Sequence, residues 1–168
     1  MSNQTERITF NALPKNLAEL QALPESSMDT PFKTAALTVC ALCAYASNKD
    51  AGVEMLNFLK GPQPLTNYDL QFLRHRFMDG NTYVPVSYFE GAMPDNNYTP
   101  SEPFTIEVFS NPYSYDNEGY ARLFIRSGGA DSERPITLRK QGSTGKWFLW
   151  EQMLLADIRK PAAQDPWA

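Results

Sequence analysis

The spacing of apolar residues changes near the middle of this chain of 168 residues. Up to about Gly80 they recur at helical spacings, whereas from about Pro103 they alternate with polar residues, as in strands with one buried face. Helices followed by strands indicate an α+β fold, with about three helices packed on an antiparallel meander of about four strands. We expect a single domain over residues 1–168, with a helical part at about 28–79 and a sheet part at about 83–160.

The first long helix is predicted to run from Pro31 to about Ala46. Asp29 or Thr30 can cap its free amides, and proline suits the first helical position because its missing N–H would have no partner there. Apolar or small residues occur on every side of the later part of this helix, which is typical of a helix enclosed by its neighbours. It is therefore expected to form the centre of the core.

Two further helices are predicted in the first half. One follows the caps at Asn48 and Asp50 and stops at Gly61. The other begins at Thr66, where Asp69 completes a capping box, and ends at about Met78. Short connections between helices favour an antiparallel helical layer.

The second half contains an aromatic loop and then strands. Tyr83–Pro100 is expected as an ordered loop, apart from a strand at Tyr83–Phe89. Four alternating runs then predict strands, separated by turns rich in Gly and Asx residues: Phe104–Phe109, Tyr120–Ser127, Pro135–Lys140 and Trp147–Glu151. Ile8–Phe10 is expected as a short strand near the N-terminus.

Alternation also predicts which side chains lie on the face of the sheet away from the helices. Cross-strand charge pairs can form there between Glu107, Arg122, Arg126 and Arg139. Phe109 and Phe124 fall on the same face. Because exposed aromatic residues on a sheet are often covered by a partner, this face is a candidate for homodimer formation.

Charge and composition indicate the cellular location of the protein and exclude some classes of binding partner. The net charge of −4 and the pI near 5.0 provide no long-range attraction to nucleic acid or to anionic lipid. The longest apolar stretch, residues 35–46, is shorter than the roughly 20 residues that cross a bilayer. No secretory leader is recognisable, and the pair Cys40 and Cys43 suits a reducing compartment. We therefore expect a cytoplasmic location, with neither nucleic acid nor a membrane as partner.

Catalytic signatures are sparse. Cys40 and Cys43 have the spacing of a redox pair but lie well inside the predicted helix, where core packing is favoured over thiolate chemistry. His75 is the only histidine, so a metal site with two histidines cannot form. No serine lies in a nucleophile elbow. The sequence therefore favours a non-catalytic protein without a cofactor or metal.

Two loops are candidates for ligand binding. Successive flexible amides in the loop at Ser127–Asp131 can form an anion-binding concavity, and the aromatic loop at 88–100 offers flat apolar faces beside amides, which suit sugars, peptides or proteins. The same residues suit a plain hairpin turn and a loop that buries its own tyrosines. The candidate ligand-binding residues are Tyr88, Asn97, Tyr98, Tyr113, Gly128, Gly129, Asp131 and Arg134.

Five short motifs support a resemblance. They are Tyr88-Phe89-Glu90-Gly91-Ala92, Asn96-Asn97-Tyr98-Thr99-Pro100, Ser127-Gly128-Gly129-Ala130-Asp131, Arg134-Pro135-Ile136 and Asp165-Pro166-Trp167. Together they resemble a bacterial family of small domains of unknown function, over most of the chain. That family supplies no activity, substrate or catalytic residue. A remoter resemblance is to the cone-shaped nuclear-transport-factor-2-like fold, which also sets helices before a curved antiparallel sheet and is the alternative fold.

Three functional hypotheses follow. The leading one is a non-catalytic binding or protein-interaction module that contacts a protein, peptide or sugar through its loops. The first alternative is a small carboxylate-based hydrolase that uses Asp131 with Arg134 or His75. The second is a homo-oligomeric assembly component that pairs through its sheet.

Overall fold

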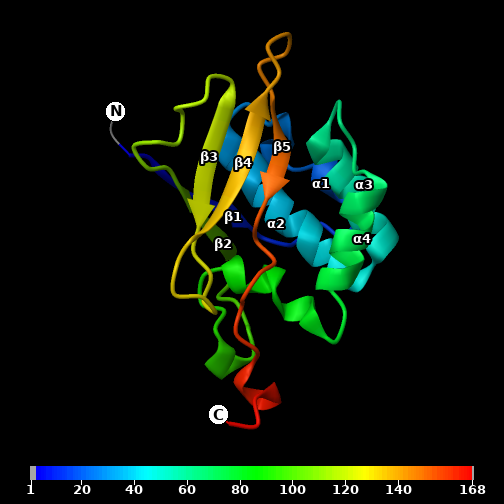
Figure 1. The fold of residues 1–168 in the computed structure, drawn as a ribbon, viewed down its shortest axis with the longest axis vertical. Helices are drawn as coiled ribbons and strands as arrows, with labels where there is room; N and C mark the ends of the chain where they lie inside the picture. The colour runs from blue at the N-terminus through cyan, green and yellow to red at the C-terminus, as the bar shows by residue number, and fades with distance from the viewer. Residues whose placement is uncertain (1–2, 168) are drawn as a thin grey trace.

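The computed structural model describes residues 3–167 and shows the expected α+β architecture (Figure 1). The strands form one antiparallel sheet in the order β1-β2-β3-β4-β5, so the predicted meander is confirmed. The strands are β1 (Thr5–Phe10), β2 (Phe104–Phe109), β3 (Tyr120–Ile125), β4 (Arg134–Lys140) and β5 (Trp147–Gln152). The helices are α1 (Leu17–Gln21), α2 (Pro31–Ser47), α3 (Lys49–Lys60) and α4 (Asn67–Arg76).

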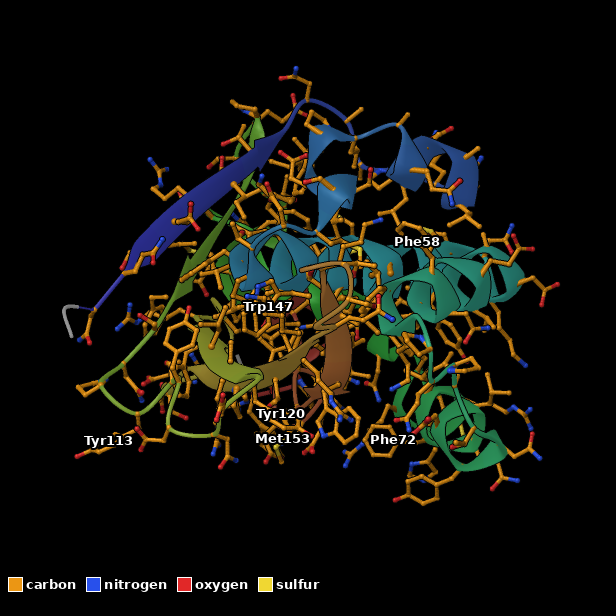
Figure 2. The ribbon with its side chains drawn as sticks, turned by 90° about the horizontal axis from the view of Figure 1, so that it is seen from above. Phe58, Phe72, Tyr113, Tyr120, Trp147 and Met153 are labelled. Atoms are coloured by element: carbon orange, nitrogen blue, oxygen red, sulfur yellow. The ribbon has the colours of Figure 1, made fainter. Side chains whose placement is uncertain are left out.

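Helix α2 lies at the centre of the molecule, as its composition predicts. It packs against all the strands and against α3, and the sheet curves around it (Figure 2). The side-chain oxygen of Thr30 accepts a hydrogen bond from the amide of Lys33 at 3.3 Å, and Pro31 occupies the first turn. Thr34 also binds the sheet directly, because its hydroxyl donates to the carbonyl of Trp147 at 2.7 Å.

The capping box predicted at the start of α4 is confirmed. The amide of Thr66 donates to the Asp69 carboxylate at 2.9 Å, and the amide of Asp69 donates to the Thr66 hydroxyl at 3.1 Å. These bonds satisfy two of the amides that a helix start leaves without partners. Helix α4 ends at Arg76, two residues before the predicted end.

The strand predicted at Tyr83–Phe89 is wrong. The chain forms two 3-10 turns there, at Asn81–Tyr83 and Pro85–Tyr88. Pro85 has no amide to donate to a strand ladder, and the Ser87 hydroxyl donates to the carbonyl of Val84 at 2.6 Å, which favours a turn. The two turns bring Tyr83 and Tyr88 against the segment after β5.

Four strand boundaries also differ from the prediction. Two differ by one residue, because β4 begins at Arg134 and β5 ends at Gln152. β1 extends beyond Ile8–Phe10 to Thr5 and pairs with β2 along its whole length, which makes a fifth strand. β3 ends at Ile125, before Ser127. The chain leaves the sheet there, because the Ser127 hydroxyl forms a hydrogen bond with the Ser87 hydroxyl at 2.7 Å. Within residues 3–167, no helix has the length and apolar character that crossing a membrane requires.

Candidate functional site

Most of the predicted ligand-binding residues converge on one segment of the chain, residues 153–161, which follows β5. Tyr88 and Tyr98 are buried, and their hydroxyls donate to the carbonyls of Leu154 and Arg159, each at 2.5 Å. Burial raises the pKa of Tyr98 to about 12, since the charged phenolate is poorly solvated there. These two rings therefore hold the chain itself.

The glycines of the Ser127–Asp131 loop contact the aromatic loop and the segment 153–161. The amide of Gly128 donates to the carbonyl of Ser87 at 2.8 Å, and a Cβ atom at Gly128 would lie 1.9 Å from the Ala92 carbonyl oxygen. A Cβ atom at Gly129 would lie 2.1 Å from the Tyr98 hydroxyl. Glycine is required at both positions because other segments approach so closely.

The charged residues after that loop also bind the chain. The Arg134 guanidinium donates to the carbonyls of Ala156 and Asp157, both at 3.2 Å. Asp131 pairs with Arg159 at 3.0 Å, and the Asp131 side chain is 96% exposed. The interpretation of the Ser127–Asp131 loop as a turn that binds the chain itself therefore accounts for these contacts.

The two remaining candidates lie elsewhere. Asn97 is exposed and adopts a left-handed conformation with φ 56°, which an Asn tolerates in a turn. Tyr113 is 73% exposed and lines a hollow on the outer face of the sheet, the face away from α2. Tyr113 thus contributes to an open surface on this face.

The outer face carries pairs of aromatic rings with arginines beside them. Phe109 and Phe124 lie with ring centres 5.9 Å apart, and the guanidinium of Arg126 lies 4.5 Å from the Phe109 ring centre. Arg122 lies 5.9 Å from the Phe124 ring. The predicted outward positions of these residues are confirmed, and the phenylalanines are partly covered by arginine.

A second cluster of the same kind lies across β3, β4 and β5. The rings of Tyr120 and Trp150 meet edge to face at 5.6 Å, and the Arg139 guanidinium lies 5.3 Å from the Tyr120 ring centre and 4.8 Å from that of Trp150. In the part of the chain that the structure describes, none of the outward arginines Arg122, Arg126 and Arg139 forms an ion pair. These arginines cover aromatic rings instead of forming the charge pairs that the alternation permits.

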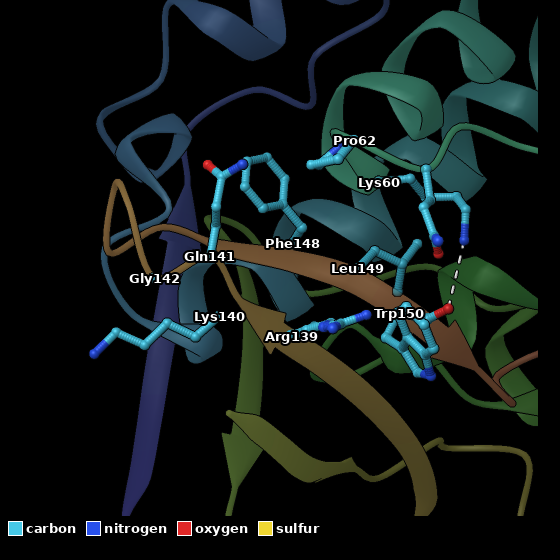
Figure 3. A pocket seen from close by; sticks show the side chains of 10 residues that line it. Lys60, Pro62, Arg139, Lys140, Gln141, Gly142, Phe148, Leu149 and Trp150 are labelled. Carbon is cyan, nitrogen blue, oxygen red and sulfur yellow. Dashed lines mark hydrogen bonds between the residues drawn. The ribbon is translucent and has the colours of Figure 1, made fainter. Parts of the chain in front are cut away.

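An irregularity in β5 lies at Trp150, next to this cluster. Leu138 pairs with Leu149 and Thr137 pairs with Glu151, so Trp150 is an extra residue without a partner on β4. Such a bulge redirects side chains and increases the local twist. Lys60 fixes the backbone here, because its ammonium group donates to the carbonyl of Trp150 at 3.4 Å (Figure 3).

Three hollows meet at Trp150. One of about 340 Å³ lies beside Arg139 and Phe148, where the side chains line the gap between the β4–β5 hairpin and α3 (Figure 3). Another of about 740 Å³ is lined by Tyr113, Tyr120, Arg122 and Glu151, and a third of about 400 Å³ by Phe72 and Met153. Figure 2 shows Tyr120, Met153 and Phe72 along the side of the molecule away from α2.

We refer to this region as the Trp150 surface. It consists of Phe72, Tyr113, Tyr120, Arg122, Arg139, Trp150, Glu151 and Met153. Sequence reasoning placed its arginines on the outer face but missed Trp150 as its centre, although alternation with the buried Leu149 puts Trp150 on that face. The available signal was a tryptophan at an outward-facing position of β5, on a face that carries other aromatic residues.

The residues of the hydrolase hypothesis are not gathered in one hollow. His75 is exposed on α4 and lines a hollow with Asp157, to which neither Asp131 nor Arg134 contributes. Burial raises the pKa of Cys43 to about 12 and also raises that of Cys40, so both thiols stay protonated at neutral pH. Among residues 3–167, no three His, Cys, Asp or Glu side chains are arranged to hold a metal ion.

The fold and this surface define a small α+β domain with an open aromatic and arginine-rich sheet face. The chain belongs to a family described as a domain of unknown function (DUF6935), whose model matches residues 12–162. The predicted membership of such a family is thereby confirmed, although β1 and the Asp165–Trp167 motif lie outside the matched residues. No curated protein and no solved structure matches the chain.

Proposed function

We propose that this domain is a non-catalytic interaction module that binds a protein or peptide segment on the Trp150 surface. The observation that carries the proposal is the Arg139 guanidinium, which lies within 5.3 Å of the centres of two aromatic rings and forms no ion pair within residues 3–167. We also propose a bacterial cytoplasm as its location, supported by the unpaired thiols of Cys40 and Cys43.

Stacking prepares Arg139 for a carboxylate. A guanidinium that lies over a ring keeps its N–H donors at the edge, where they match the geometry of a carboxylate in two parallel hydrogen bonds. The rings of Tyr120 and Trp150 restrict its motion, so less conformational entropy is lost on binding. Tryptophan, tyrosine and arginine are also the residues that dominate binding energy at protein interfaces.

The neighbouring charges favour a peptide over a polyanion. Glu118 and Glu151 line the same hollow as Arg122, together with Asp116. These carboxylates repel a nucleic acid backbone but leave room for a single carboxylate next to an arginine. The apolar groups of Phe72 and Met153 suit an aromatic or aliphatic side chain beside that carboxylate.

Selection from a displayed peptide library tests the proposal. The library is first depleted on the double variant Arg139→Ala, Trp150→Ala and then selected on the unchanged protein. We expect the enriched peptides to carry Asp or Glu beside an apolar or aromatic residue and to bind Arg139→Ala at least about tenfold more weakly, as expected for loss of an interface anchor.

Met78→Ala is the matched control, because Met78 is 50% exposed and lines a different hollow. It should leave peptide affinity unchanged. Chemical shifts of the Trp150 indole N–H should move on titration with an enriched peptide. Peptides that bind the double variant equally well, or a library of glycans that binds where peptides do not, would contradict the proposal.

A further inference from the structure

The Asp165-Pro166-Trp167 motif is the one motif of the resemblance that the fold does not use. The other motifs contact one another or the segment 153–161. The hydrogen bonds at Asp165–Trp167 are local: the amide of Trp167 donates to the Asp165 carboxylate at 2.9 Å, and the amide of Asp165 donates to the Ala162 carbonyl at 3.1 Å. Trp167 is 93% exposed, more than any other large apolar residue in the described chain. An exposed tryptophan offers a large apolar ring and an N–H donor to a binding partner.

The segment lies apart from the Trp150 surface of its own molecule. Figure 1 shows it projecting beyond the 3-10 turns at the end of the molecule opposite the β4–β5 hairpin. Pro161 is buried and anchors the chain just before it, through the short 3-10 helix Ala162–Gln164. A segment that projects from this end of the molecule is placed to contact another molecule.

The chemistry of the motif matches that of the Trp150 surface. Asp165 supplies a carboxylate, and the unpaired donors on that surface belong to Arg139 and Arg122. Trp167 supplies a large ring, and Trp150 borders hollows whose walls include Met153 and Phe72. Pro166 restricts the backbone between them, so the acid and the ring are held at a narrow range of separations.

We propose that the Asp165–Trp167 segment of one copy binds the Trp150 surface of a second copy. This inference rests on the proposed function, because it uses the same surface and names its partner. In a symmetric pair each copy donates its segment to the other, so the contact occurs twice. It also explains why an aromatic ring and an aromatic face are both exposed in the isolated chain.

The size of the contact limits its strength. A tryptophan buries about 150–250 Å², so two such segments remain well below the roughly 1,200–2,000 Å² of a stable interface. The dimer should therefore be weak and concentration-dependent, with a dissociation constant of about 10⁻⁶ M or larger.

Sedimentation equilibrium tests the proposal, with Trp167→Ala as the main variant because Trp167 is almost fully exposed and its loss leaves the core intact. We expect the unchanged protein to dimerise and Trp167→Ala, Asp165→Asn and Arg139→Ala each to raise the dissociation constant, by about tenfold or more for Trp167→Ala. Met78→Ala should dimerise like the unchanged protein.

A mixing experiment shows whether the segment and the surface contact each other. Trp167→Ala keeps an intact surface and Arg139→Ala keeps an intact segment, so their mixture should form a heterodimer through one intact contact at concentrations where each variant alone is mostly monomeric. A monomer at all concentrations up to about 10⁻³ M, or a dimer that Trp167→Ala leaves unchanged, would overturn the inference.

The outcomes separate this inference from the proposed function. If library peptides bind the Trp150 surface while the protein stays monomeric, the surface binds a partner other than a second copy, and only the inference fails. If the protein dimerises independently of Trp167 and no peptide binds the surface, both fail.

Discussion

At the residue scale, three tyrosine hydroxyls hold one stretch of backbone. Those of Tyr83, Tyr88 and Tyr98 donate to carbonyls between Leu154 and Arg159. This stretch contains no helix or strand, so its carbonyls have no regular partners and need side-chain donors. The aromatic loop therefore has a structural role for its tyrosines.

Tyr98→Phe removes one of these bonds and one titrating group. We expect the free energy of unfolding at pH 7 to fall by about 1 kcal/mol. The pKa of Tyr98 is raised to about 12, above the unfolded value of about 10, so its contribution is complete below about pH 10 and is lost as the pH rises toward 12. The variant should therefore lose less stability than the unchanged protein between about pH 10 and pH 12.

Urea denaturation at several pH values across that window measures both effects. Tyr113→Phe is the control, because Tyr113 is exposed and donates no side-chain hydrogen bond among the described residues. It should match the unchanged protein at every pH. If Tyr98→Phe and the unchanged protein lose the same free energy of unfolding between about pH 10 and pH 12, Tyr98 does not titrate at a raised pKa in the folded protein.

At the element scale, the crossing of α2 and α3 depends on one glycine. A Cβ atom at Gly52 would lie 2.3 Å from the Cα atom of Tyr45, so the backbones of the two helices approach closely. The contact is with backbone and cannot be relieved by turning a side chain. This is a packing role for a glycine inside a helix, where alanine would otherwise be favoured.

Gly52→Ala should therefore lower the free energy of unfolding, by about 1–3 kcal/mol for the forced separation of the helices. Gly142→Ala is the matched control, since no atom lies within 4 Å of its Cβ position. The control should leave stability unchanged or raise it by up to about 1 kcal/mol. Thermal or urea denaturation compares the two. Equal effects would show that α2 and α3 can separate without cost.

Elements were predictable where the signal is local. The cap at Thr30 and the capping box at Thr66 and Asp69 involve residues three apart, and both were predicted correctly. The full length of β1 was missed, because Glu6 and Arg7 have little strand character and this part becomes a strand only by pairing with β2, about a hundred residues away.

At the scale of the whole molecule, α2 joins the helical and sheet parts in one core. It contacts α3 on one side and every strand on the others, so neither part can keep its buried surface without the other. The division at about residue 80 is therefore a change of element type within one continuous core.

We expect a single cooperative unfolding transition. Far-ultraviolet circular dichroism reports mainly the helices, and tryptophan fluorescence reports β5 through Trp147 and Trp150. Both should give the same midpoint in urea. Two separate midpoints would show that the helices and the sheet unfold independently.

The sequence by itself determined the α+β class, the central helix and the outward arginines, because residue spacing depends on the period of each element and on its immediate neighbours. Only the tertiary structure decided which partners these residues meet. It directed Tyr88, Tyr98 and Arg134 onto the chain's own carbonyls and brought Trp150 into contact with Arg139. Such contacts join residues far apart in the chain, and local spacing contains no information about their distance in space.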